Sequence, residues 1–371
     1  MRELTWQEID DILVGAAALG CGGGGELSEG RQLLRSAYDK GHSVMLAGPD
    51  ELPGEALVVC PYAVGGLTAG SQDDYRGLEL AAENPGVLAV RALGEHMGRS
   101  PDALVAGELG GGSIADSFYP AAIMGLPVVD ADPVGRAVPE IEHSLFSVGG
   151  IPIAPQALVN EVGDTVIITR VADDRRSEAL VRALAVASRN AIWVADHALP
   201  WSAMRPYLVL GSISRAMGVG AALRKALVEG ADPAAAIAAA AGGGILFRGR
   251  VVACDWEERD GFGWGETRLM GVGADSGAEY RVWFKNENLM GWRDDLPDVT
   301  APDLIVLVGP DGATISNPHA AMGDHVAVLG LPAADAWRTR GAVEVLGPRH
   351  FGFDVDFVPV EARHPWMTEG R

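Results

Sequence analysis

The sequence predicts an α/β protein: an N-terminal α/β layered domain is followed by a C-terminal part containing a β-barrel. In the first half, short buried strands alternate with helices, as at VMLAG (44–48), ALVVCPYAVGG (56–66) and LPVVDAD (126–132). This alternation is typical of α/β layers with a mainly parallel sheet. From Gly242 to about Val360 the pattern changes to short apolar runs, several alternating at period two. Such runs indicate a β-barrel or sandwich.

The first predicted helix follows Thr5 and runs to about Leu19. Thr5 and Glu8 match the capping-box pattern, in which each side chain satisfies a free backbone N–H group at the helix start. Apolar residues recur three or four positions apart along it, which is the spacing of one helix face. A glycine-rich turn ends this helix, and a second helical pattern covers about 28–38.

The remaining elements are predicted from the same two kinds of pattern. Helices are expected at about 85–98, 114–125, 175–190, 213–230 and 232–241, and further strands at 103–112 and 165–170. Strands of the barrel are expected at 245–258, 268–273, 280–289, 304–310, 325–331 and 343–347.

The length of 371 residues is enough for two domains. We expect an α/β domain at 1–165 and a C-terminal region at 166–371. Within the second region, we expect helices at about 175–241 and a barrel-like domain at about 242–360.

Charge and cysteine content exclude several classes of function. The chain has 29 Lys+Arg and 50 Asp+Glu, a formal net charge of −21, so general affinity for nucleic acid or an anionic membrane is not expected. Its three cysteines are far apart and form no CxxC pair, which argues against a disulfide framework or a cysteine-rich zinc site. Neither a signal-peptide pattern nor a run of about 18 apolar residues is visible. We therefore expect a cytoplasmic protein with a small-molecule substrate.

The most informative segment is VVDADPVGRAVPE (128–140). Asp130 and Asp132 leave an apolar strand two positions apart, so they would share one side if the strand continues through them. Paired carboxylates divide acid and base roles or bind a hard cation. Arg136 is suited to pair with one of them or with a substrate carboxylate, and Glu140 adds a further acid. The alternative is a salt-bridged loop between sheet and helix.

Two glycine-rich segments are further candidates. Glu108 lies at the end of a predicted strand and is followed by a glycine run and Ser113. Open α/β sheets bind their ligands beyond the carboxyl ends of their strands. The alternative for Glu108 and Ser113 is a helix-capping network. The second segment consists of Gly22, Gly23, Gly24 and Gly25. Its backbone N–H groups are suited to approach an anion, and the alternative is a conformationally demanding turn.

Asn286 and Glu287 lie in the β-rich part, where they either border a cleft or satisfy a barrel turn. Three histidines, His197, His319 and His325, lie near predicted strand ends or turns and are weak candidates for metal ligands. A divalent metal such as zinc is the cofactor we consider. The alternative is that each of these histidines is a surface residue, or a core residue whose hydrogen bonds are satisfied.

The whole set of motifs resembles one known family, DUF917, which is also named for S-methyl thiohydantoin desulfurase and is often encoded near hydantoinase/oxoprolinase proteins. The matching segments are LGCGGGG (19–25), GELGGGS (107–113), LPVVDADPVGRAVPE (126–140), KNENL (285–289), APDLIVL (301–307) and GDHVAVLGLPA (323–333). The resemblance covers nearly the whole chain. It implies an N-terminal α/β domain, a C-terminal part with a β-barrel and, for members with that name, hydrolytic removal of the S-methyl group from a thiohydantoin ring.

The reaction implied by this resemblance needs an activated water and donors for the negative charge that develops. Our hypothesis is that Asp130 and Asp132 activate or position the water. Arg136 would hold a carboxylate or a ring oxygen, and the glycine loop would supply N–H donors. Two alternatives remain: a non-catalytic helper subunit of a hydantoinase-like assembly, and a small-molecule binding protein. For partner proteins, we consider a homo-oligomer or a hydantoinase-like partner.

Overall fold

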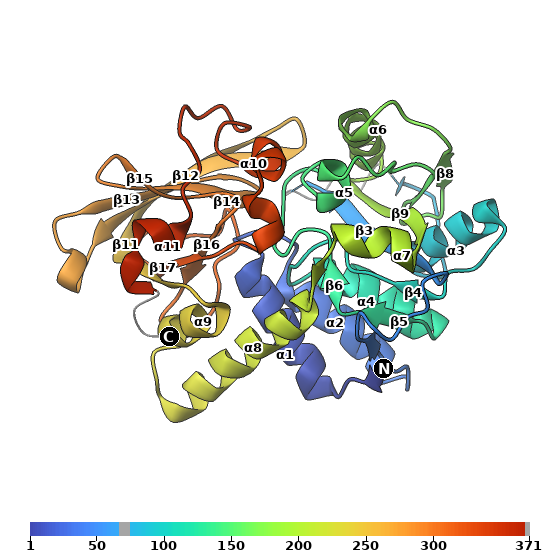
Figure 1. The fold of residues 1–371 in the computed structure, drawn as a ribbon, viewed down its shortest axis with the longest axis horizontal. Helices are drawn as coiled ribbons and strands as arrows, with labels where there is room; N and C mark the ends of the chain where they lie inside the picture. The colour runs from blue at the N-terminus through green and yellow to red at the C-terminus, as the bar shows by residue number, and fades with distance from the viewer. Residues whose placement is uncertain (67–74, 368–371) are drawn as a thin grey trace.

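Two large sheets lie side by side in the computed structural model, which describes residues 1–66 and 75–367 (Figure 1). The first has eight strands, which are, in spatial order, β1 (Arg2–Glu3), β2 (Met45–Ala47), β5 (Pro127–Val129), β4 (Ala103–Leu104), β3 (Leu57–Gly65), β9 (Ala191–Pro200), β7 (Gln156–Val159) and β8 (Thr165–Ile168). A short separate pairing joins β6 (Ala131–Asp132) to β10 (Val209–Leu210). The α/β class predicted for this half is confirmed.

The first sheet is mixed, and the expectation of a mainly parallel sheet is wrong. Strands β2, β5, β4 and β3 pair in parallel, whereas β9 runs antiparallel to β3 and β7 antiparallel to β9. Because β9 spans Ala191–Pro200, this sheet extends past the domain boundary that we expected near residue 165. The β3–β9 pairing places Tyr62 of β3 and Asp196 of β9 on adjacent strands.

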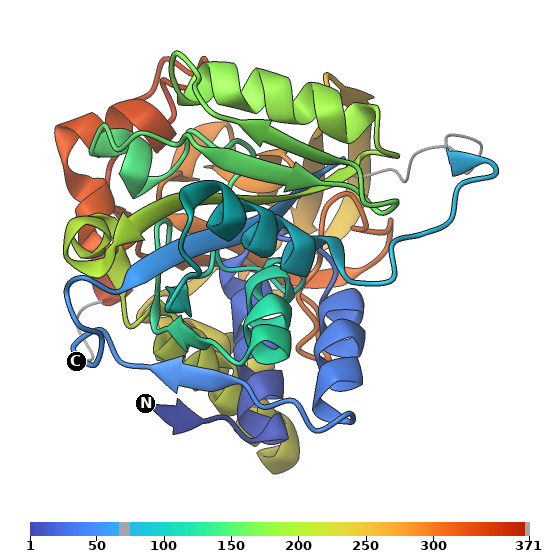
Figure 2. The ribbon, with the colours of Figure 1, turned by 90° about the vertical axis from the view of Figure 1, so that its right-hand side faces the viewer.

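Helices cover both faces of this sheet, as successive residues of β9 demonstrate (Figure 2). Val194 packs in a cluster with Val181 of α6 (Asp174–Val186), whereas Ala195 packs in the cluster that holds Val90 of α3 (Pro85–Met97). The further helices of the chain are α1 (Trp6–Leu19), α2 (Leu27–Tyr38), α4 (Ser113–Met124), α5 (Leu145–Val148), α7 (Trp201–Met204), α8 (Ser212–Glu229), α9 (Pro233–Ala241), α10 (Arg340–Leu346) and α11 (Val360–Arg363), with 3₁₀ turns at Arg205–Tyr207, Gly273–Asp275, Asp335–Arg338 and Pro365–Met367. The capping box predicted at Thr5 and Glu8 starts α1.

Helices α1 and α8 pack closely at the boundary between the two halves (Figure 1). A Cβ atom on Gly15 would lie 1.8 Å from the carbonyl oxygen of Ala216, and one on Gly220 would lie 1.9 Å from that of Asp11. Glycine at both positions therefore lets the two backbones touch. Arg224 adds an ion pair with Asp11, at 2.8 Å.

The second sheet is antiparallel and curls into a half-barrel of seven strands. In spatial order these are β15 (Leu296–Thr300), β14 (Glu287–Arg293), β13 (Glu279–Lys285), β12 (Phe262–Gly271), β11 (Gly244–Arg259), β17 (His325–Leu331) and β16 (Leu304–Val308). The side-chain amide of Asn288 in β14 donates to the carbonyl oxygen of Ile305 in β16 at 3.1 Å, across the curled sheet. The barrel-like C-terminal part predicted from the sequence is confirmed in this half-barrel form.

One predicted barrel strand is wrong. Residues 343–347 lie in and just after α10, which Thr339 caps by accepting a hydrogen bond from the backbone N–H of Ala342. Ala342 and Leu346 are buried four positions apart, which is helical spacing, and this packing overrides the alternating appearance of VEVLG. Among the described residues, no helix is both long and apolar enough to cross a bilayer.

Candidate functional site

A cavity of about 790 Å³ lies between the two halves of the molecule. Both halves contribute to its wall, which includes segments 22–26, 62–66, 107–108, 138–141, 196–197, 286–287 and 316–319. Residues 107–108 and 65–66 follow or end parallel strands, and ligands of open α/β sheets bind beyond such ends. A cavity of this size and position is where small-molecule sites are normally found.

Glu108 projects a half-buried carboxyl group into the wall of this cavity. The hydroxyl of Ser113 donates to one carboxyl oxygen at 2.7 Å, and the backbone N–H of Val138 donates to the other at 2.9 Å. Burial raises the pKa of Glu108 to about 7, and the nearby Asp132 carboxylate adds to the effect. Glu108 is therefore able to hold or release a proton near neutral pH.

A second acid, Glu287, lines the same cavity and is only 3% exposed. Its Oε2 atom is buried and makes no hydrogen bond with the described residues. Burial raises the pKa of Glu287 well above its ordinary value, and the charge of Glu108 raises it further. Two interacting acids in one cavity titrate as a pair, so one of them retains a proton when the other has lost its own.

The two glycine runs interlock behind these acids. The N–H groups of Gly112 and Ser113 both donate to the carbonyl oxygen of Gly24, each at 2.9 Å, and a Cβ atom on Gly24 would lie 2.6 Å from Cα of Gly110. The N–H of Gly23 donates to the carbonyl oxygen of Gly20. Gly22, Gly23, Gly24 and Gly25 all line the cavity, as the ligand hypothesis requires. Close backbone packing nevertheless explains much of the glycine content, and the N–H of Gly23 has a partner within the loop.

A histidine oriented by an aspartate also faces this cavity. His197 Nδ1 lies 2.7 Å from the Asp196 carboxylate, which accepts a second hydrogen bond from the Tyr62 hydroxyl at 2.6 Å. Because the carboxylate accepts, Nδ1 carries the imidazole proton and Nε2 bears the lone pair. Nε2 is buried and makes no hydrogen bond with the described residues. His197 has the positive φ of 43° and stacks on Phe146, with ring centroids 4.2 Å apart, so its ring is held in place.

Asp130 and Asp132 have structural partners, and the described lining of the cavity includes neither of them. Asp130 Oδ1 accepts from the backbone N–H of Ser214 in the first turn of α8, at 2.9 Å. Asp132 accepts from the N–H groups of Val134 and Gly135 at 2.7 and 2.5 Å. Burial raises the pKa of Asp132 to about 6, and these hydrogen bonds partly offset that rise. The geometry favours the alternative of a structural loop between sheet and helix, but the contacts of these two aspartates are hydrogen bonds and not the salt bridges expected.

Arg136 is 1% exposed and connects the two halves of the chain. Its guanidinium donates to the carbonyl oxygens of Asp303 at 2.9 Å and Asn288 at 2.8 Å, and its Nε donates to that of Ala137 at 3.0 Å. The described cavity lining does not include it. These contacts leave Arg136 no access to a substrate carboxylate in this conformation.

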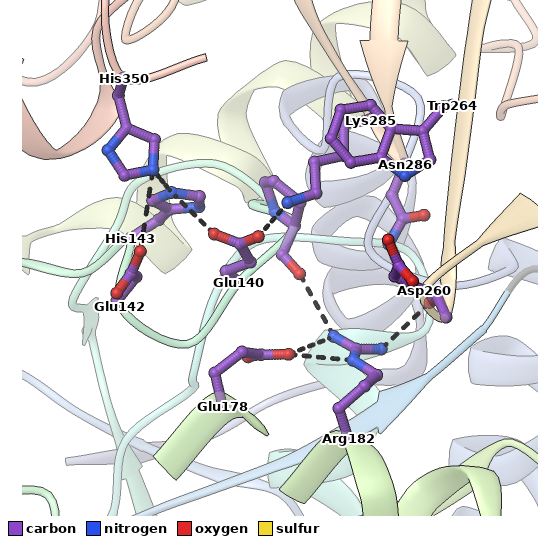
Figure 3. A network of polar contacts seen from close by, with 12 residues as sticks. Glu140, Glu142, His143, Glu178, Arg182, Asp260, Trp264, Lys285, Asn286 and His350 are labelled. Carbon is purple, nitrogen blue, oxygen red and sulfur yellow. Dashed lines mark hydrogen bonds and ion pairs between the residues drawn. The ribbon is translucent and has the colours of Figure 1, made fainter. Parts of the chain in front are cut away.

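Glu140 lines the cavity and forms an ion pair with Lys285 of β13 (Figure 3). Asn286 adopts a positive φ of 56° in the turn between β13 and β14, and its Oδ1 accepts from the N–H of Gly263 at 2.8 Å. The barrel-turn alternative therefore accounts for the Asn286 side chain, although the residue also borders the cavity.

The three histidines proposed as metal ligands share no site. His197 lies inside the cavity, His319 is exposed at its rim beside Ser316, and His325 is exposed at the start of β17. Among the described residues, the group whose ligand atoms are close enough for one ion is a different one: Glu140, Glu142, His143 and His350. Only Glu140 of this group was singled out from the sequence.

Comparison with known proteins places this chain in a family. Residues 7–170 match the model of the S-Me-THD-like N-terminal domain, and residues 172–360 match that of the S-Me-THD-like C-terminal domain. The chain belongs to the S-Me-THD-like family. The family resemblance inferred from the sequence motifs is thereby confirmed. No curated protein matches the sequence.

The S-Me-THD-like fold is also seen in an X-ray crystal structure of a protein from Chromobacterium violaceum. That protein is 24% identical in sequence, and the alignment covers 97% of this chain and 100% of the other with a TM-score of 0.78. At this identity the likeness establishes the shared fold and not a shared activity.

Proposed function

We propose that the protein is a hydrolase acting on a thiohydantoin or hydantoin-like ring, with removal of an S-methyl group as its reaction. The observation that carries the proposal is the cavity of this S-Me-THD-like chain, whose wall holds two interacting acids and an aspartate-oriented histidine. Its volume of about 790 Å³ is ample for a five-membered ring with a substituent.

The chemistry consumes one water molecule and moves both of its protons. Water adds to the ring carbon that bears sulfur, the carbon–sulfur bond breaks, and methanethiol leaves with one proton of the water. The oxygen and the other proton remain on the ring as C=O and N–H. A base must therefore accept a proton from the attacking water, and an acid must protonate the ring nitrogen. Both groups return to their starting forms when the base protonates the leaving sulfur and the acid recovers the hydroxyl proton as the C=O bond forms.

We assign the base to His197 and the acid to Glu108. The Nε2 lone pair of His197 accepts the proton of the attacking water, and Asp196 stabilises the imidazolium that forms. Glu108, with a pKa of about 7, delivers a proton from its neutral form. Burial and the nearby Asp132 carboxylate keep the neutral form of Glu108 populated near neutral pH.

The test is release of methanethiol from a purified protein incubated with an S-methyl thiohydantoin, measured with a thiol reagent and confirmed by the mass of the ring product. We expect His197→Asn and Glu108→Gln each to lower the rate about 100-fold or more. Asparagine is chosen because it tolerates the positive φ of His197. The matched controls are His96→Asn and Glu95→Gln on the exposed surface of α3, which should retain the wild-type rate.

Failure of the purified chain to release thiol from any ring analogue would refute the proposal. If such an analogue still raised the melting temperature, the protein would be a small-molecule binding protein instead. If thiol release appeared only with a co-purifying hydantoinase-like subunit, and survived both active-site substitutions, the helper-subunit alternative would replace the proposal.

A further inference from the structure

Four potential metal ligands converge beside the cavity, from segments about two hundred residues apart in the sequence. Glu140, Glu142 and His143 lie in the loop after β6, and His350 follows α10 (Figure 3). One ligand atom from each lies within 4.8 Å of every other. The two imidazole rings meet edge-on at 82°, with the Nε2 atoms of His143 and His350 2.9 Å apart.

The four groups set two carboxylates against two imidazole rings. Glu140 Oε2 lies 3.5 Å from Nε2 of His143, and Glu142 Oε1 lies 3.8 Å from Nε2 of His350. His143 is fully buried, and its Nδ1 makes no hydrogen bond with the described residues. A proton shared between the two rings gives a hydrogen-bond partner only to the two Nε2 atoms. A cation between the four side chains would instead bind a ligand atom of each.

We propose that Glu140, Glu142, His143 and His350 form a binding site for one divalent transition-metal ion, with Zn²⁺ as the preferred ion. Two imidazole nitrogens with two carboxylate oxygens are a ligand set suited to zinc. Ligands about 2 Å from a tetrahedral ion lie about 3.3 Å apart. Three of the distances between these groups, 2.9, 3.5 and 3.8 Å, are close to that spacing, and all the ligand atoms lie within 4.8 Å of one another.

Lys285 supports this assignment by orienting one ligand. Its ammonium group pairs with Oε1 of Glu140, which leaves Oε2 on the side of the histidines. The ammonium is itself held over the ring of Phe262, 4.1 Å from the centroid. Such a contact to the second oxygen of a carboxylate ligand is how outer groups fix metal-binding side chains.

The metal would join the loop of the first half to the segment after α10 and would lie between two cavities. Glu140 lines the large cavity, whereas Glu142 and His350 line a second cavity of about 670 Å³. This inference goes beyond the proposed hydrolase function, because nothing in the assignment of His197 and Glu108 requires a metal. Its test therefore measures binding and stability and not turnover.

The experiment is a titration of chelator-treated, dialysed protein with ZnCl₂ by calorimetry, with metal content and melting temperature measured on the same samples. We expect about one Zn²⁺ per chain and a melting temperature that rises with Zn²⁺ concentration. His350→Ala and Glu142→Gln, which change partly exposed side chains, should weaken binding more than 10-fold, and Lys285→Met about 10-fold or more. His325→Ala is the matched control and should bind like the wild type.

Two results would overturn the proposal. One is a chain with a native circular dichroism spectrum that takes up no stoichiometric Zn²⁺. The other is binding that persists at wild-type affinity in both His350→Ala and Glu142→Gln, since the ion would then lie elsewhere. Both variants are compared by their affinity for Zn²⁺. Failure of the metal proposal therefore leaves the hydrolase proposal untouched, and failure of the thiol-release assay leaves the metal proposal untouched.

Discussion

Glu287 occupies the space that a side chain on Gly23 would need. A Cβ atom on Gly23 would lie 1.9 Å from Oε1 of Glu287 and 2.6 Å from its carboxyl carbon. No positive φ demands glycine at position 23, so the requirement comes from this contact alone. The glycine loop thus sets the place of a buried acid from the other half of the chain.

The first prediction is that Gly23→Ala displaces the Glu287 carboxyl group. Because that group is buried, its movement forces neighbours to shift, and we expect a loss of about 1 to 3 kcal/mol in the free energy of unfolding. Thiol release should fall at least 10-fold, since the acid pair is disturbed. Chemical denaturation and the thiol assay measure the two effects.

Gly218→Ala is the matched control for this substitution. Gly218 lies within α8, and a Cβ atom there meets no atom within 4 Å. Alanine should therefore stabilise the helix by about 0.5 to 1 kcal/mol and leave activity unchanged. If Gly23→Ala behaved like Gly218→Ala, the proposed link between the glycine loop and Glu287 would be wrong.

The second prediction concerns the pH dependence of stability at Glu108. Its pKa is raised from an ordinary value of 4.5 to about 7, so between these values the folded protein binds more protons than the unfolded chain. The free energy of unfolding must then fall as pH rises through this window. Glu108→Gln removes the titration, so its stability relative to the wild type should improve between pH 4.5 and 8, by up to about 3 kcal/mol.

Urea denaturation of both proteins at several pH values measures this difference. Glu95→Gln, at an exposed position of α3, is the control, and its free energy of unfolding should change with pH as that of the wild type does. A constant difference between Glu108→Gln and the wild type across pH 4.5 to 8 would contradict the raised pKa. In the activity assay, a wild-type rate that stays level above pH 7 would argue against neutral Glu108 as the acid.

Local patterns, which are visible in one segment at a time, predict several residues of the candidate site. Glu108 is expected at the end of a strand over 103–112, but the strand that forms, β4, ends at Leu104. The glycine runs were recognised as special turns, but their mutual packing depends on contacts between Gly24 and Gly110 that no local pattern reveals.

The features that sequence reasoning missed depend on pairing across the fold. Asp196 and Tyr62 meet because β9 runs antiparallel to β3, which a mainly parallel sheet would not allow. Likewise, His143 is not among the residues selected from the sequence, although the nearby Glu140 and Glu142 are a usable local signal. The fourth member of that cluster, His350, comes from a segment expected to follow a strand that is in fact helix α10.

The third prediction tests whether Asp196 orients His197. Asp196→Asn removes the charge that favours the Nδ1–H form of the imidazole and should lower the rate about 100-fold or more, with a changed pH profile. Tyr62→Phe removes only the hydroxyl that donates to the same carboxylate, and the expected loss is smaller. Asp196→Glu, which retains the charge, should recover part of the rate. A loss of rate in Asp196→Asn with an unchanged pH profile would indicate a purely structural role.

The final prediction separates a structural role of Arg136 from substrate binding. Arg136→Met keeps the bulk of the side chain but leaves the buried carbonyl oxygens of Asn288 and Asp303 without their donor. Each unsatisfied group costs about 1 to 3 kcal/mol, so we expect a loss of about 2 to 5 kcal/mol in the free energy of unfolding. Arg340→Met, on the exposed surface of α10, should change stability by less than about 0.5 kcal/mol. Protein that remains folded at low temperature should keep its KM, because Arg136 does not reach the cavity; a KM raised at least 10-fold with unchanged stability would instead restore Arg136 as a substrate-binding residue.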